Sequence, residues 1–108
     1  MSKKNAGKPE FVIVWEFLVK PGKPSDFETV YGPEGDWVGF FRHGKGYIRT
    51  ELIRDDKNPR RYLTLDVWTT RKAYLRFKKE NRASYQAIDE KCMSLTEDET
   101  LVREFQPQ

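Results

Sequence analysis

The longest hydrophobic stretch of the chain runs from residue 11 to residue 19 and reads FVIVWEFLV. Side chains along an extended strand point alternately to its two faces. Here the odd-numbered positions are all apolar, and the even-numbered positions are apolar except for Glu16. A strand that is apolar on both faces is covered on both sides, so this segment is predicted to be a central strand of a sheet.

Helical spacing appears twice after a break at Pro21 and Gly22. Apolar residues at positions 27, 30 and 31 lie one turn apart, and Gly32-Pro33 ends that segment. Ser25 and Glu28 have the spacing of a capping box, which places the start of this helix near Ser25. The same apolar spacing recurs at positions 37, 40 and 41 and predicts a second short helical piece that ends near Gly44.

Two alternating segments follow, residues 47–54 and 62–68, and they predict two strands joined by a polar loop. Thr69 or Thr70 can then cap a helix whose apolar stripe runs from Tyr74 to Leu95. A single helix of that length is unusual in a globular domain, so Asn81 is predicted to mark a bend. Residues 96–99 are predicted to form a turn, and residues 101–105 a short edge strand.

The predicted order of elements is β-α-β-β-α-β. This order is typical of the ferredoxin-like α+β fold, an antiparallel sheet with both helices on one face. The helices therefore cover only one of the two apolar faces of the first strand. Because a large apolar face is rarely left in water, the expected cover for the other face is a second copy of the same sheet, and the chain is expected to form a homodimer.

The positive charge of the chain is confined to its first residues. The 108 residues include 20 Lys and Arg against 17 Asp and Glu, a net charge of +3. Lys3, Lys4 and Lys8 lie in an opening segment without acids, and the 17 other basic residues balance the 17 acidic ones. Residues 1–9 are therefore predicted to be a disordered basic N-terminal arm, and residues 10–106 a single folded domain.

The residue content excludes several kinds of site and location. Cys92 is the one cysteine, so no internal disulfide forms, and Cys92 and His43 alone cannot build a metal site. No apolar run approaches the roughly 20 residues of a membrane span, and none follows the basic start as in a secretory signal. The chain is expected to be cytoplasmic and away from membranes. It has no phosphate loop, nucleophile elbow or dinucleotide-binding glycine motif, so neither a cofactor nor a metal is expected.

RNA binding is the alternative from another class, because RNA recognition motifs share the predicted element order. Those domains carry a signature resembling Lys-Gly-Phe-Gly-Phe-Val on their third strand. The nearest match here, Gly44-Lys45-Gly46-Tyr47, opens the second strand instead, and the third strand carries Asp66. An acid at that place and a body without excess positive charge argue against a nucleic-acid partner.

Several separated motifs resemble one branch of the antibiotic biosynthesis monooxygenase domains, in the family's order, from about residue 11 to residue 105. They read Val14-Trp15-Glu16-Phe17, Tyr31-Gly32-Pro33, Gly35-Asp36-Trp37, Gly46-Tyr47, Thr50-Glu51-Leu52, Tyr62 to Trp68, and Tyr85 with Asp89 before Leu95-Thr96. The resemblance implies a dimeric α/β barrel, in which two ferredoxin-like protomers join their sheets. It also implies activities that differ among members, including cofactor-independent oxygenation of polycyclic quinols. The Asn, Trp and His of the haem-degrading branch do not carry over, which disfavours haem degradation.

Three side chains are candidates for moving protons. His43 has the ordinary pKa nearest neutrality, but its basic loop favours a solvated surface role. Glu16 and Asp66 interrupt strands that are otherwise buried, where a carboxylate must be paired, hydrogen-bonded, protonated or facing a cavity. On neighbouring strands the two carboxylates can share one pocket. The structural alternative is an ion pair with Arg49, Arg61 or Arg103.

Aromatic residues are the candidate walls of a pocket for a flat apolar ligand, namely Trp15, Tyr31, Trp37, Trp68 and Tyr74. Cofactor-free oxygenation needs such a pocket to hold its substrate and exclude water, and a group that takes a phenolic proton. The same aromatic residues also fit a plain hydrophobic core. The resemblance to the antibiotic biosynthesis monooxygenase domains implies a cofactor-independent monooxygenase acting on an aromatic, quinol-like small molecule. The alternative is a non-catalytic homodimeric module of the same fold, which binds a small molecule or serves a structural role.

Overall fold

Strand β1 (Phe11–Val19) lies inside the sheet, as its two apolar faces predict. The computed structural model describes residues 10–106, and its four strands are arranged in the order β2-β3-β1-β4. β1 pairs antiparallel with both β3 (Arg61–Trp68) and β4 (Thr96–Phe105), and β2 (Tyr47–Arg54) pairs antiparallel with β3. This is the predicted ferredoxin-like α+β arrangement.

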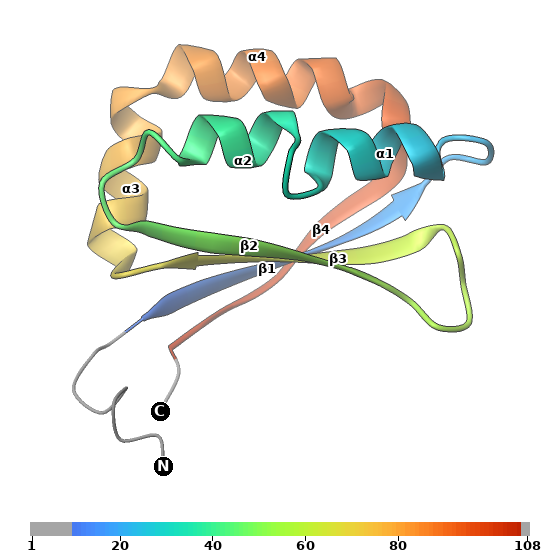
Figure 1. Ribbon diagram of the computed structural model, residues 1–108, viewed down its shortest axis with the longest axis horizontal. Helices are drawn as coiled ribbons and strands as arrows, with labels where there is room; N and C mark the ends of the chain where they lie inside the picture. Colours follow the sequence, from blue (N-terminus) through green and yellow to red (C-terminus); the bar gives the residue numbers. More distant parts are fainter. Residues whose placement is uncertain (1–9, 107–108) are drawn as a thin grey trace.

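The helices all lie on one face of the sheet (Figure 1). The connection from β1 to β2 contains α1 (Pro24–Tyr31) and α2 (Asp36–Phe41). The connection from β3 to β4 contains α3 (Arg71–Glu80), α4 (Arg82–Cys92) and the short 3-10 helix η2 (Met93–Leu95). In Figure 1 α4 and α2 run side by side above the sheet, and α3 covers the end where β2 begins.

Hydrogen bonds that involve side chains explain where α3 begins and where the chain bends between α3 and α4. The Thr70 hydroxyl accepts a hydrogen bond from the backbone N–H of Ala73 and so caps α3. At Asn81 the backbone leaves the helical region, with φ −124° and ψ 34°, and the Asn81 amide donates to the carbonyl of Phe77. The predicted bend at Asn81 is therefore confirmed.

The predicted turn at residues 96–99 is wrong, because these residues form the first part of β4. They pair with the far end of β1, with Asp98 opposite Leu18 and Glu99 opposite Phe17. A run of acidic residues resembles a turn in the local sequence, but an edge strand exposes its polar side chains to water while its backbone completes the sheet. β4 therefore pairs with β1 along nearly the whole length of β1, from Val12 to Val19.

The core lies between the sheet and the helices. The odd-numbered residues of β1 point into the core, and all of them except Trp15 are buried. Phe17 contacts aromatic rings of α1, and Phe11 contacts Tyr74 of α3. Phe27 of α1 contacts Phe17, Tyr31 and Tyr62, with ring centroids 4.2 to 5.2 Å apart. These contacts hold α1 on the sheet by aromatic burial.

The opposite sheet face carries no helix in the part of the chain that the structure describes (Figure 1). We call it the open sheet face and define it by the apolar side chains that the strand registers place there: Val12, Val14, Leu18, Ile53, Leu63, Leu65, Val67 and Phe105. Ile53 is 44% exposed on this face. The second apolar side of β1 is thus present, and no helix within residues 10–106 covers it.

None of the helices in the described chain is both long enough and apolar enough to cross a membrane.

Candidate functional site

A small cavity opens between the helix-facing side of the sheet and the helices. Its volume is about 30 Å³, room for a water molecule or two. The walls are mostly aromatic, with three carboxylates and no Lys, Arg or His among them: Trp15, Phe17, Tyr31, Trp37, Phe41, Thr50, Thr64, Asp66, Tyr85, Asp89 and Glu99. The cavity therefore combines flat apolar surfaces with acidic groups.

Asp66 is the buried carboxylate of this cavity. It lies on β3, between Ile13 of β1 and Thr50 of β2, and its exposed fraction is 8%. The Thr50 hydroxyl donates to Asp66 Oδ1 over 2.8 Å, and the Tyr47 and Thr50 hydroxyl oxygens are also 2.8 Å apart. Because Thr50 has one hydroxyl proton and gives it to Asp66, Tyr47 donates to Thr50.

Burial determines the proton affinity of Asp66. It raises the pKa of the Asp66 carboxyl from 3.8 to about 6, and the hydrogen bond from Thr50 opposes part of that rise. Thr50 provides the one hydrogen bond to this carboxylate from the described side chains. A carboxyl with a pKa near 6 that faces a cavity can accept a proton from a ligand at neutral pH.

Two further acids reach the cavity from other elements. Asp89 lies on α4 and Glu99 on the edge strand β4. Shielding from solvent raises the pKa of Glu99, and the neighbouring Asp89 carboxylate raises it further. A site with this charge favours neutral or proton-donating groups on a ligand over anionic ones.

The polar atoms of the aromatic walls are hydrogen-bond donors. Burial raises the pKa of Tyr31 and of Tyr85 far above the usual value of 10, so both hydroxyls keep their protons. The indole Nε1 of Trp37 is buried without a hydrogen-bond partner among the described residues. The rings of Trp37 and Tyr85 meet edge to face, with centroids 5.1 Å apart.

The structure brings four of the sequence-predicted site residues together at this cavity: Trp15, Tyr31, Trp37 and Asp66. Trp68 and Tyr74 do not line it. They pack against each other in the core, with ring centroids 5.6 Å apart, and Trp68 is completely buried. Trp68 and Tyr74 contribute here to packing between β3 and α3.

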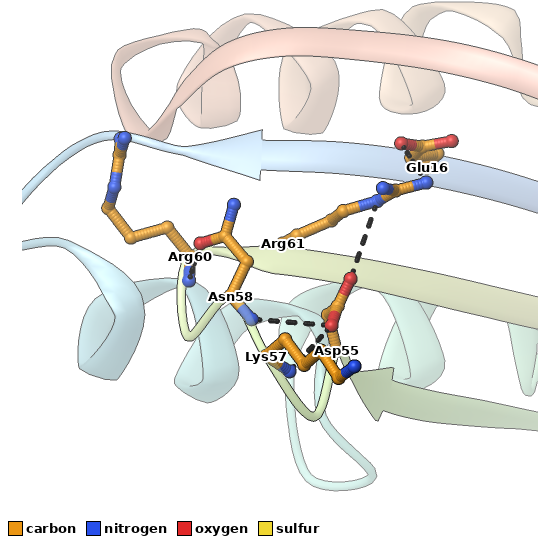
Figure 2. A network of polar contacts seen from close by, with 6 residues as sticks. All are labelled: Glu16, Asp55, Lys57, Asn58, Arg60 and Arg61. Atoms are coloured by element: carbon orange, nitrogen blue, oxygen red, sulfur yellow. Dashed lines mark hydrogen bonds and ion pairs between the residues drawn. The ribbon is translucent and has the colours of Figure 1, made fainter.

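The expectation that Glu16 and Asp66 share one pocket is wrong. Glu16 lies opposite Leu63 and Asp66 opposite Ile13, so the two carboxylates point to opposite faces of the sheet. On the open sheet face Glu16 forms an ion pair of 2.7 Å with Arg61, which also lies 3.9 Å from Asp55 (Figure 2). The structural alternative for Glu16, an ion pair with Arg61, is therefore the observed one.

His43 follows α2 in an exposed loop and does not line the cavity. Its backbone N–H donates to the carbonyl of Phe40 at the end of α2. The structure thus places His43 away from Asp66.

Five cavity residues with polar groups were missed as site candidates: Thr50, Thr64, Tyr85, Asp89 and Glu99. Tyr85 and Asp89 are four residues apart, so they share a face of α4, and this spacing is a usable signal. Thr50 and Glu99 give no such signal, because alternation along a strand does not show which neighbour lies across the sheet. Within residues 10–106 no group of three or more His, Cys, Asp or Glu side chains could hold a metal ion.

The fold and the cavity together define a class, a ferredoxin-like α+β domain with an acidic, aromatic-walled cavity between its sheet and its helices. The model of the antibiotic biosynthesis monooxygenase family matches residues 10–90. The chain therefore belongs to the antibiotic biosynthesis monooxygenase family. No curated protein sequence gives a significant match.

Solved structures share the fold. SnoaB, a cofactor-independent oxygenase from Streptomyces nogalater, superimposes with a TM-score of 0.69 at 22% identity, over 92% of this chain and 91% of that one. Protein SO0527 from Shewanella oneidensis gives 0.65 at 20% identity, over 94% and 93% of the two chains. PA3566 from Pseudomonas aeruginosa gives 0.64 at 15% identity, with the same coverage of 94% and 93%. At these identities the likeness establishes the fold alone.

Proposed function

We propose that the protein is a cofactor-independent monooxygenase acting on an aromatic, quinol-like small molecule at the cavity beside Asp66. The observation that carries this proposal is a buried carboxyl with a pKa of about 6 against aromatic walls. Family membership and the fold shared with SnoaB, a cofactor-independent oxygenase, support the same reaction class.

Asp66 has the role of proton acceptor in this proposal. A flat hydroxylated ring lies against the aromatic walls, and its hydroxyl donates to the Asp66 carboxylate. Transfer of that proton leaves an electron-rich phenolate, the form of the ring that reacts with molecular oxygen. The protonated hydroxyls of Tyr31 and Tyr85 and the free Trp37 N–H are donors for the negative charge that develops on ring oxygens.

Oxygen uptake tests this function directly. The full-length protein is mixed with a panel of hydroxylated naphthalenes and anthracenes, and the dissolved oxygen is followed. We expect turnover with at least one of these quinols, and a loss of roughly 10²- to 10⁴-fold in Asp66→Asn, which keeps the shape but cannot accept the proton. Glu16→Gln is the matched control on the other sheet face and should keep its rate. No uptake above buffer with any compound contradicts the proposal.

The small cavity volume favours the second candidate, a non-catalytic homodimeric module of the same fold. A cavity of about 30 Å³ holds water and no multi-ring ligand unless side chains such as Tyr85 move. If Trp fluorescence and calorimetry detect no binding of any panel compound, the module is the better account.

Homodimer formation belongs to the same proposal. The open sheet face has apolar side chains from four strands, and its Arg61–Glu16 ion pair lies among them. A second copy placed on this face would cover these side chains by an isologous contact. The family resemblance implies the same pairing. The cytoplasmic location expected from the sequence stays a prediction.

A further inference from the structure

A second, larger cavity lies on the outer side of the α3–α4 junction. Its volume is about 520 Å³, far larger than the inner cavity beside Asp66. Its lining residues come from two helices. They are Leu75, Lys78 and Lys79 of α3 and Arg82, Tyr85, Gln86 and Asp89 of α4. We call this cavity the outer groove.

The outer groove and the inner cavity share a wall. Tyr85 and Asp89 line both. The Tyr85 ring contacts Trp37 on the inner side, with ring centroids 5.1 Å apart, and the Lys78 ammonium lies 4.9 Å from the same ring. Tyr85 is thus a side chain between the two spaces. It is half-buried against the core, where its ring contacts Trp37 and Phe40, and the Lys78 ammonium lies over the same ring.

The two cavities have opposite charge. Asp66, Asp89 and Glu99 line the inner one, without any basic side chain. Three basic residues line the outer groove against the single acid Asp89. Lys79 and Arg82 are exposed and make no ion pair with any residue from 10 to 106. Positive charge without an internal partner is available for an anion from outside.

We propose that the outer groove is a binding subsite for a carboxylate carried by the aromatic ligand, so that the substrate class is that of hydroxylated aromatic carboxylic acids. The ligand enters past Tyr85 with its hydroxyl end toward Asp66, and its carboxylate stays with Lys79 and Arg82. The inner half of this assignment rests on the proposed function, while the outer half rests on the groove and its charges. The planar guanidinium of Arg82 suits bidentate recognition of a carboxylate.

The charge contrast also sets the orientation of such a ligand. A carboxylate in the inner cavity would face Asp66, Asp89 and Glu99, and like charges at short range repel. In the outer groove the same carboxylate meets three cations. The hydroxyl end is thereby directed inward, where the proton acceptor lies.

Calorimetric titration of the full-length protein with two probes tests the subsite. The probes are 6-hydroxy-2-naphthoate and 2-naphthol, which differ in the carboxylate. At low ionic strength we expect the acid to bind roughly five- to tenfold more tightly, the range for two partly exposed charge contacts. The preference of the protein for the acid over the naphthol should fall at a salt concentration on the order of 0.5 M, because salt screens exposed charge contacts.

Two double variants provide the matched comparison. K79Q/R82Q removes two positive charges from the groove, and K72Q/R76Q removes two from exposed positions of α3 outside it. We expect K79Q/R82Q to bind the two probes equally and K72Q/R76Q to keep the preference. Equal binding of the probes by the unaltered protein, no binding of either, or an equal loss in both variants overturns the subsite.

The outcome is separable from that of the proposed function. Preference for the acid without oxygen uptake by any quinol leaves the subsite standing and contradicts the oxygenase. Oxygen uptake with equal binding of acid and naphthol contradicts the subsite and leaves the oxygenase standing.

Discussion

Asp66 is the one charged side chain that the structure buries within residues 10–106. Its neighbours on the sheet are apolar or carry hydroxyl groups, and Thr50 supplies a single hydrogen bond. Burying a carboxylate without a counter-charge destabilises the folded state. Because burial disfavours the charged form, the pKa of the Asp66 carboxyl is raised to about 6. The same environment that penalises the charge makes Asp66 a useful proton acceptor near neutral pH.

Asp66→Asn is predicted to stabilise the protein at pH 8. The folded state binds the Asp66 proton more tightly than the unfolded state, since the pKa rises from 3.8 to about 6. The stability that this residue contributes is present below about pH 4 and is lost as the pH rises through 6. Asparagine does not titrate and still accepts from Thr50, so the variant should gain about 2–3 kcal/mol at pH 8 and almost nothing at pH 4.

Urea unfolding at the two pH values measures this difference. Glu99, whose pKa is also raised, is present in both proteins, so its contribution is common to the two sides of the comparison. An equal change in the free energy of unfolding at pH 4 and pH 8 contradicts the burial account of Asp66.

At the scale of elements, periodicity predicted the strands and helices because each element has its own local signal. The odd-even pattern of β1, the Thr70 cap and the break at Asn81 are all readable within a few residues. Which residues share a face across strands depends on register, and no local pattern contains it. That is why Asp66 could be selected from the sequence, whereas Glu16 was wrongly expected to share its pocket and Thr50 was missed.

The cap at Thr70 is predicted to anchor α3, and with it the outer groove. Thr70→Ala removes the hydrogen bond to the Ala73 N–H and should cost about 1 kcal/mol of unfolding free energy. Thr69→Ala is the neighbouring control, because the Thr69 hydroxyl does not cap the helix, and it should change stability by less than about 0.5 kcal/mol. Chemical denaturation of both variants measures their free energies of unfolding. Equal losses of unfolding free energy in the two variants contradict the capping role of Thr70.

At the scale of the whole molecule, the sheet has one covered face and one open face. The open sheet face has apolar side chains that would otherwise contact water, among them Val12, Leu65 and Ile53. Family membership is shown by the match of the family model to residues 10–90. The predicted homodimer is the assembly that would remove this apolar surface from solvent.

Leu65→Lys is predicted to produce a monomer, because it places a charge at the centre of the open sheet face. Light scattering at micromolar concentration should report a dimer for the unaltered protein and a monomer for the variant. Met93→Lys is the matched control, since Met93 is 68% exposed on η2, away from that face, and should stay dimeric. A monomeric unaltered protein contradicts the prediction outright.

The most direct test of the central claim is the pH profile of oxygen uptake with a hydroxylated naphthalene or anthracene, without added metal or cofactor. If Asp66 takes the phenolic proton, kcat/KM rises with pH about a midpoint near 6, the pKa of that carboxyl, and the rising limb disappears in Asp66→Asn. A profile that is flat between pH 5 and 8, or one that Asp66→Asn leaves unchanged, contradicts the account.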